Sequence, residues 1–313
     1  MAASRGGTLR ASLGGGGGGS CAGAGGGGGG RWEGMSRDLL EAILARVGAP
    51  DLVAAVPFVC SSWREASRDP LFWRRLDLGD WDAVSRRLRR GGGGGGGGTA
   101  AAEFAGILRV AVARGQGRTE SISFPSFADE VHLLFVAERC PNVLYFSLPN
   151  PRIALDRFCE AIGKLKLLKG MAVDESLITN EVLLHIKNCC KNFSELRICA
   201  ESVNREIASV ICKYLPNLKK LEITNSVISK QAIITLLDGL EQLEHFDISG
   251  YRNSTITDLV LQKASRLKVF LWDSKLELGE LMDCSHCEDD LVLQRPCECV
   301  LNQRVMEWLA EVS

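Results

Sequence analysis

The chain is poor in aromatic residues, in net charge and in long apolar runs, and the last two shortages exclude classes of protein. Aromatic residues make up only 6% of the 313 residues. The net charge of −1 gives no basic footprint of the kind that binds nucleic acid. No apolar run approaches the roughly 18 residues that cross a bilayer, and the N-terminus has no secretory core. We therefore expect an intracellular protein of the nucleus or cytoplasm, with no membrane and no nucleic acid among its partners.

Motifs of catalysis and cofactor binding are missing as well. The glycine runs at 14–19, 25–30 and 91–98 lack the closing residues of a phosphate-binding loop. His132, His185 and His245 stand alone, and no nucleophile, base and orienting acid recur at an informative spacing. His132 and His185 fall in helical patterns, where we predict packed or surface positions. We expect no enzyme activity and no cofactor.

Glycine is instead concentrated at one end of the chain, where 26 of the 34 glycines precede residue 99. Such runs are typical of flexible tethers, and the run at 91–98 predicts two units that behave independently. The predicted domains are a disordered N-terminus at 1–30, a small helical unit at 31–80, a helical linker with its tether at 81–118, a repeat region at 119–272 and an acidic, cysteine-containing cap at 273–313.

A repeat is the strongest signal in the larger unit. The template Leu-x-x-Leu-x-Leu, with other apolar residues allowed, begins at positions separated by 25, 25, 25, 25 and 24 residues: Val143, Leu168, Phe193, Leu218, Leu243 and Leu267. A weaker copy begins at Thr119. Both period and pattern are typical of leucine-rich repeats, in which a strand and a helix alternate. The predicted fold is therefore an α/β solenoid behind a small all-α unit, which is α+β overall.

Residues that alternate with the apolar strand positions are expected to line the inner face of this solenoid. Neighbouring repeats place Glu195 beside Lys220 and Arg197 beside Glu222, and we predict that these charges neutralise each other. A mixed-charge recognition patch is the alternative. The uncharged or weakly charged inner positions remain as candidate substrate contacts, namely Tyr145, His245 and Leu271.

The scarce aromatics gather in the small unit, at Trp63, Phe72 and Trp73. One helix is predicted after an N-cap at Ser36, a second from about Asp51, and a third through Trp63. A unit of this size buries only part of its apolar surface. The remainder is available to a partner.

Residues 35–78, "MSRDLLEAILARVGAPDLVAAVPFVCSSWREASRDPLFWRRLDL", resemble an F-box. The resemblance is carried by the Asp-Leu-Leu-x-x-Ile-Leu run at 38–44, by Asp51-Leu52, and by the closing run from Val59-Cys60 through Trp63 to Trp73. In combination with the repeats, the chain resembles a plant F-box/LRR-repeat protein. Met35-Ser36 replaces the Leu-Pro of the family pattern, which predicts a less rigid helix start and weaker adaptor binding.

The resemblance implies a function for each unit. An F-box binds the Skp adaptor of a Skp/cullin/F-box ubiquitin ligase, and the repeats hold a protein substrate. The residues expected to bind the adaptor, and through it a cullin, are Met35, Leu39, Leu40, Ile43, Leu44, Leu52, Val59, Cys60, Trp63, Leu71 and Trp73. The alternative function is an interaction scaffold that keeps the repeats without feeding a ligase.

The tail contains four cysteines whose spacing raises the question of zinc: Cys284, Cys287, Cys297 and Cys299. The first pair has the usual two-residue gap, whereas one residue separates the second pair. We favour ordinary thiols in a capping segment and keep zinc as the alternative. Leu301, Val305, Trp308 and Leu309 predict an amphipathic helix that covers the last repeat.

Overall fold

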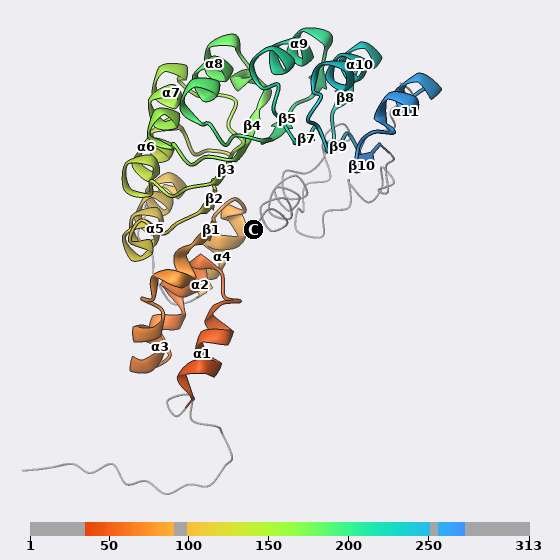
Figure 1. Cartoon of the computed structure of the whole chain (residues 1–313). Helices are drawn as coiled ribbons and strands as arrows, with labels where there is room; N and C mark the ends of the chain where they lie inside the picture. Colours follow the sequence, from red (N-terminus) through yellow and green to blue (C-terminus); the bar gives the residue numbers. More distant parts are fainter. Residues whose placement is uncertain (1–34, 91–98, 251–255, 273–313) are drawn as a thin grey trace, which may run out of the picture.

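The computed structural model describes residues 35–90, 99–250 and 256–272, which form a helical unit that runs into a curved sheet (Figure 1). The expected α+β character is confirmed. Predictions for the N-terminus, the acidic tail, the four tail cysteines and the terminal helix lie outside the described residues. Within those residues no helix is long and apolar enough to cross a membrane.

The helical unit consists of short helices joined by tight turns. Its elements are α1 (Arg37–Leu44), α2 (Ala49–Ala54), the 3-10 turn η2 (Val56–Phe58), α3 (Ser61–Ala66) and the 3-10 turn η3 (Pro70–Trp73). As predicted, Ser36 caps α1: its hydroxyl accepts a hydrogen bond from the Leu39 amide at 3.4 Å. Pro50 lies in the first turn of α2, where the missing N–H costs nothing.

A sheet of eight parallel strands follows, and eight helices accompany it in the described residues. Its strands are β1 (Arg75–Asp77), β2 (Ser121–Ser123), β3 (Tyr145–Leu148), β4 (Gly170–Asp174), β5 (Glu195–Cys199), β7 (Lys220–Glu222), β9 (His245–Asp247) and β10 (Val269–Leu271), in this order. Between them lie α4 (Trp81–Arg90), α5 (Ala100–Gly115), α6 (Glu130–Arg139), α7 (Leu155–Lys164), α8 (Asn180–Cys189), α9 (Arg205–Tyr214), α10 (Lys230–Gly239) and, after β9, α11 (Asp258–Ala264). The turn η4 (Glu175–Leu177) follows β4, and β6 (Ser202–Val203) pairs with β8 (Val227–Ile228) in a second small sheet.

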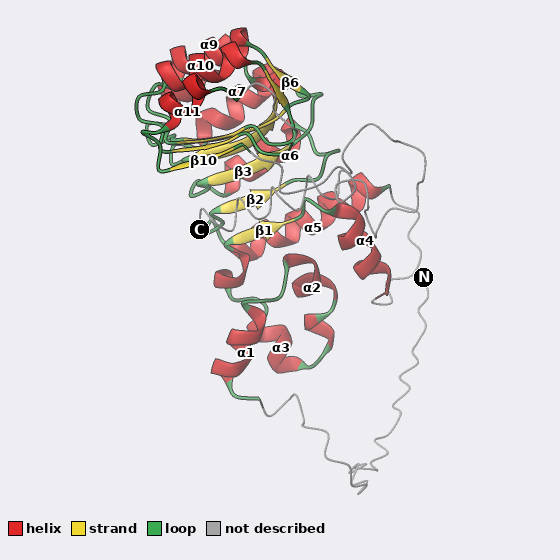
Figure 2. Cartoon of the chain, turned by 90° about the vertical axis from the view of Figure 1, so that its right-hand side faces the viewer, coloured by secondary structure: helices red, strands yellow, loops and turns green. Residues whose placement is uncertain are grey.

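The helices α6 to α11 lie along the outside of the arc and the sheet lines its inside, as Figures 1 and 2 show from two directions. The strand register follows the 25-residue period, because Tyr145 pairs with Gly170, which in turn pairs with Glu195. The middle apolar position is fully buried between sheet and helices in five strands, at Phe146, Met171, Leu196, Leu221 and Phe246. In the last strand, Phe270 is only partly buried. The predicted inner-face columns are confirmed by this register.

The first strand, β1, is a feature that we did not predict. It pairs with β2, so Leu76 lies opposite Ile122. Trp73, Leu76 and Leu78 carry the same apolar spacing as the later repeats, and all three are buried. This copy of the template was missed because it does not follow the 25-residue period. The helices α4 and α5 and the glycine run between them lengthen the distance to the next copy, at Thr119, to 46 residues.

The expectation of two independent units does not hold, because the elements on either side of residues 91–98 pack together. Arg114 on α5 lies over the ring of Trp73 at 5.1 Å and donates to the Leu52 carbonyl at 3.2 Å. The Thr119 hydroxyl donates to the Trp73 carbonyl at 3.1 Å. Strand pairing and this packing make the helical unit the first layer of the curved sheet.

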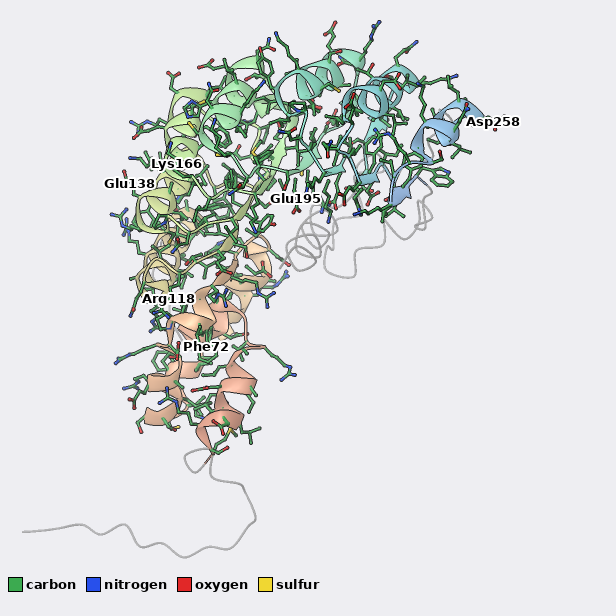
Figure 3. The ribbon with its side chains drawn as sticks, viewed as in Figure 1. Phe72, Arg118, Glu138, Lys166, Glu195 and Asp258 are labelled. Atoms are coloured by element: carbon green, nitrogen blue, oxygen red, sulfur yellow. The ribbon has the colours of Figure 1, made fainter. Side chains whose placement is uncertain are left out.

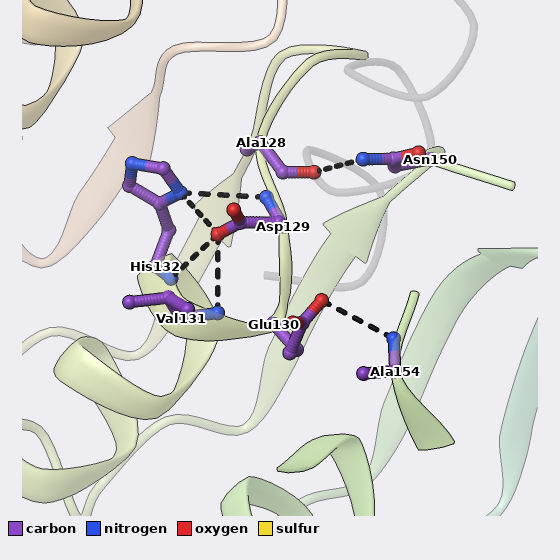
Figure 4. A network of polar contacts seen from close by, with 7 residues as sticks. All are labelled: Ala128, Asp129, Glu130, Val131, His132, Asn150 and Ala154. Atoms are coloured by element: carbon purple, nitrogen blue, oxygen red, sulfur yellow. Dashed lines mark hydrogen bonds and ion pairs between the residues drawn. The ribbon is translucent and has the colours of Figure 1, made fainter. Parts of the chain in front are cut away.

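The isolated histidines of the helices are packed, as predicted. Figure 4 shows Asp129 capping α6: its carboxylate accepts from the Val131 and His132 amides and contacts His132 Nδ1 at 2.7 Å. The His132 ring also packs against Phe104 of α5, with centroids 5.0 Å apart. His185 Nε2 lies 3.5 Å from the Cys189 sulfur on the same helix.

Candidate functional sites on the helical unit and the inner face

Four large apolar side chains of the helical unit are exposed, and we call them the apolar set. Their exposed fractions are 54% for Leu39, 75% for Phe58, 45% for Val59 and 56% for Leu71. They come from α1, from the η2–α3 turn and from η3. In both Figure 1 and Figure 2, α1 and α3 lie side by side at the end of the molecule far from the sheet. Exposed apolar side chains at one end of a small unit indicate a protein-binding surface.

The eleven residues expected to bind an adaptor fall into three groups. Leu39, Val59 and Leu71 are exposed. Partly buried side chains that pack against the core come from Met35, Ile43 and Cys60. The remaining side chains belong to the core itself: Leu40, Leu44, Leu52, Trp63 and Trp73. The core residues therefore support a surface from behind, and direct contact with a partner in this conformation is restricted to the first two groups.

Phe58 is the most exposed of these side chains and was absent from the sequence prediction. It ends the η2 turn, directly after the buried Pro57, so the backbone turns away from the core at this point. The signal was present in the sequence, since Phe58 stands next to Val59 in the unit where the scarce aromatics of the chain gather. We missed it because the turn follows neither a helical nor a strand period.

The inner face carries a group of charged residues around Glu222, which we call the polar cluster. Lys220 Nζ lies 3.0 Å from Glu222 Oε1, and Arg197 Nη1 lies 3.6 Å from Oε2. His245 Nε2 is 3.9 Å from Oε1. Arg197 and Glu222 are nearly completely buried, and Arg197 also donates to the Thr224 hydroxyl at 3.2 Å. The predicted pairing of Arg197 with Glu222 is present, whereas Lys220 turns to Glu222.

Burial raises the pKa of two inner-face carboxylates. For Glu222, desolvation raises the pKa, and Arg197 and Lys220 partly oppose it. For Glu195, desolvation again raises the pKa, while the hydrogen bond from Tyr145 and the charge of Lys220 lower it. The Tyr145 hydroxyl donates to Glu195 Oε1 at 3.1 Å, and burial followed by the Glu195 charge raises the pKa of Tyr145. These contacts make the centre of the inner face a closed polar network.

The three candidate substrate contacts are not equally accessible. Tyr145 is buried with its hydroxyl held by Glu195, so it is unsuited to open contact. The His245 side chain is about one quarter exposed, and Leu271 is 43% exposed. Leu271 lies beside Trp272, which stacks on Phe270 at 5.1 Å. The accessible part of the inner face therefore lies at β9 and β10.

Residues that could hold a metal ion do not come together in the described ranges: no group of three or more His, Cys, Asp or Glu side chains has suitable geometry there. The four tail cysteines lie outside those ranges, so zinc stays an untested alternative. Seven cysteines of the described residues are free thiols, and burial raises the pKa of Cys190 to about 12. These thiols are packing residues.

Comparison with known proteins identifies the helical unit. The F-box-like family profile matches residues 37–79, which span α1 to β1. The chain therefore carries an F-box domain at its N-terminal end. It is 28% identical to the F-box/LRR-repeat protein At3g48880 of Arabidopsis thaliana over 83% of this chain and 89% of the relative.

A second Arabidopsis thaliana relative, the F-box protein SKIP19, is 28% identical over 69% of this chain and 68% of the relative. Both similarities extend far beyond the F-box into the repeated part of the sequence. Over most of its length the chain is therefore similar to plant F-box/LRR-repeat proteins.

Proposed function

We propose that the chain is the substrate-recognition subunit of a Skp/cullin/F-box ubiquitin ligase. In this function residues 31–80 bind the Skp adaptor, which joins them to a cullin, and residues 119–272 form leucine-rich repeats that hold a protein substrate. F-box domains generally bind Skp-type adaptors, and F-box/LRR proteins are typically non-catalytic. The chain contributes recognition and position, and the other subunits transfer ubiquitin.

The apolar set carries this proposal. Four exposed side chains of 45% to 75% exposure are a large apolar surplus for a unit of about 45 residues, and burying each against a partner is worth roughly 1.5 to 3 kcal/mol. Ser36 also offsets part of the missing family proline, because it supplies the N-cap hydrogen bond that starts α1. The start of α1 is therefore capped without that proline, and weaker adaptor binding stays a prediction.

The repeat assignment is supported by the strand geometry. The parallel strands follow chain order with a helix between most neighbours, and the apolar template positions point between sheet and helices. A protein substrate is expected at β9 and β10, where His245, Leu271 and Trp272 are accessible. The buried polar cluster supports that surface and contributes few direct contacts.

The direct test is adaptor capture by surface variants. Phe58→Asp and Leu71→Asp place a charge on the apolar set, which should abolish co-purification with the Skp adaptor. Val227→Asp is the matched control, because Val227 is 59% exposed but lies on β8, far along the chain from the F-box.

All three variants should keep the circular dichroism spectrum and melting temperature of the parent protein, since exposed substitutions change stability by about 0.5 kcal/mol or less. If the two F-box variants still capture the adaptor as well as Val227→Asp does, the apolar set is not the docking surface.

A further inference from the structure

The two cationic residue types are divided sharply along the chain. Residues 1–163 contain nineteen arginines and no lysine. All twelve lysines lie between Lys164 and Lys275, with only six arginines from residue 164 onward. The lysine-free part includes the whole F-box domain and the first two strands after it.

Side-chain contacts explain some but not all of the arginines in the lysine-free part of the chain. Arg114 does need its planar guanidinium, because it lies over Trp73 and donates to Leu52. Arg68, Arg109 and Arg118 are exposed, and their side chains make no hydrogen bond or ion pair within the described ranges. Lysine would keep the charge at these three positions equally well, so packing does not explain its absence.

The lysines themselves gather on one edge of the repeats. Because the strands are parallel and in register, every turn from a helix to the next strand lies on the same side of the sheet. Seven exposed lysines lie either in the C-terminal part of α7, α8 and α9 or in the turns from these helices to the next strands. We call them the lysine edge: Lys164, Lys166, Lys169, Lys187, Lys191, Lys213 and Lys219. Figure 3 shows Lys166 farther from the F-box than Arg118.

The chemical difference between these side chains bears on ubiquitin transfer. A neutral lysine Nζ attacks the thioester carbonyl that joins ubiquitin to a conjugating enzyme. The new C–N amide bond forms, the C–S bond breaks, the thiolate leaves and the amine proton passes to solvent. A guanidinium is always protonated and delocalised, so arginine is not an acceptor.

We propose that this chain confines its own ubiquitin attachment to the lysine edge and that its adaptor-binding half is kept free of acceptor amines. This inference rests on the proposed function, because it needs a ligase that brings charged conjugating enzyme to the chain. The lysine-free half can then stay docked on the adaptor without being modified. The lysine edge is the place where the receptor itself is marked.

The test uses the full chain bound to the Skp adaptor and a cullin, with activating enzyme, conjugating enzyme and ubiquitin. Glycine-glycine remnants on lysine are mapped by mass spectrometry. In the parent protein the remnants should lie on the lysine edge, and replacing its seven lysines by arginine should remove most of them. The triple variant Arg68→Lys, Arg109→Lys, Arg118→Lys should gain remnants at the new positions.

The same three positions changed to glutamine are the matched control, since they alter the surface without adding an amine. If the triple lysine variant binds the adaptor and gains no remnant at residues 68, 109 or 118, the absence of lysine is only a compositional bias and the proposal fails. Parent remnants concentrated outside the lysine edge overturn it as well. Loss of adaptor capture by the parent protein overturns the proposed function itself, and a pull-down before the reaction separates the two failures.

Discussion

The helical unit and the repeated sheet place their side chains in opposite ways. The helical unit leaves Leu39, Phe58, Val59 and Leu71 in solvent, although all are apolar. The sheet buries Arg197 and Glu222, although both are charged. A small unit has too little interior for its apolar residues. In the sheet, the register of β5 and β7 brings opposite charges beside each other, Glu195 with Lys220 and Arg197 with Glu222. Exposure thus makes the first region the candidate partner surface, and burial makes the charged residues of the second region part of its interior.

The largest expected effect tests whether the two regions are separable at all. Trp73→Ala removes a fully buried ring under Arg114 at the junction, and such truncations cost about 3 to 5 kcal/mol of unfolding free energy. Because β1 continues the sheet, we expect one cooperative transition, shifted to lower urea, by both circular dichroism and tryptophan fluorescence. A first transition confined to the F-box would show that the regions are independent.

Breaking the buried charge pair should have the next largest effect. Arg197→Met leaves Glu222 buried with Lys220 as its nearest remaining cation, and removing one partner of a buried pair costs about 3 kcal/mol. The double variant Arg197→Met, Glu222→Leu should recover part of this loss, because no uncompensated carboxylate remains. Urea unfolding of both variants and of Glu222→Leu alone completes the cycle, and equal losses in all three would contradict the pairing.

Glu195 gives a smaller, pH-dependent effect. Its folded-state pKa is raised, so its contribution to stability is fully present below the ordinary value of 4.5 and is lost as pH rises through the folded pKa. Glu195→Gln stays neutral and should lack this loss, while its amide oxygen still accepts from Tyr145. Unfolding free energies measured across this range should converge at low pH and diverge above it. Parallel curves for parent and variant would show that the carboxylate is not strained by burial.

The smallest effect on stability is expected at the apolar set. Phe58→Ala removes a side chain that is 75% exposed, so the unfolding free energy should change by about 0.5 kcal/mol or less. Adaptor affinity, measured by titration calorimetry, should fall clearly in the same variant. A marked stability loss would place Phe58 in the core, and the contrast between the two regions would weaken.

The residues that could be predicted from sequence are those that obey a period. Phe146, Met171, Leu196 and Leu221 recur every 25 residues, so their burial and register followed directly. Burial within the F-box could not be read in this way: Leu39 and Leu40 are adjacent and similar, yet one is exposed and the other is core. β1 was missed because inserted helices interrupt the period. The contact of Lys220 with Glu222 was missed because both residues lie on β7, whereas the repeat gives only the neighbours on adjacent strands.

Because β1 pairs with the later strands in one sheet, the position of each inner-face residue relative to the F-box changes by whole strand spacings. Each repeat advances the sheet by one strand spacing, about 4.8 Å. The distance of an inner-face residue from the F-box is therefore fixed by the number of strands between its own strand and β1. Adding or deleting one complete 25-residue repeat would move every later inner-face side chain by one strand spacing relative to the F-box. A change in loop length would leave these positions unchanged.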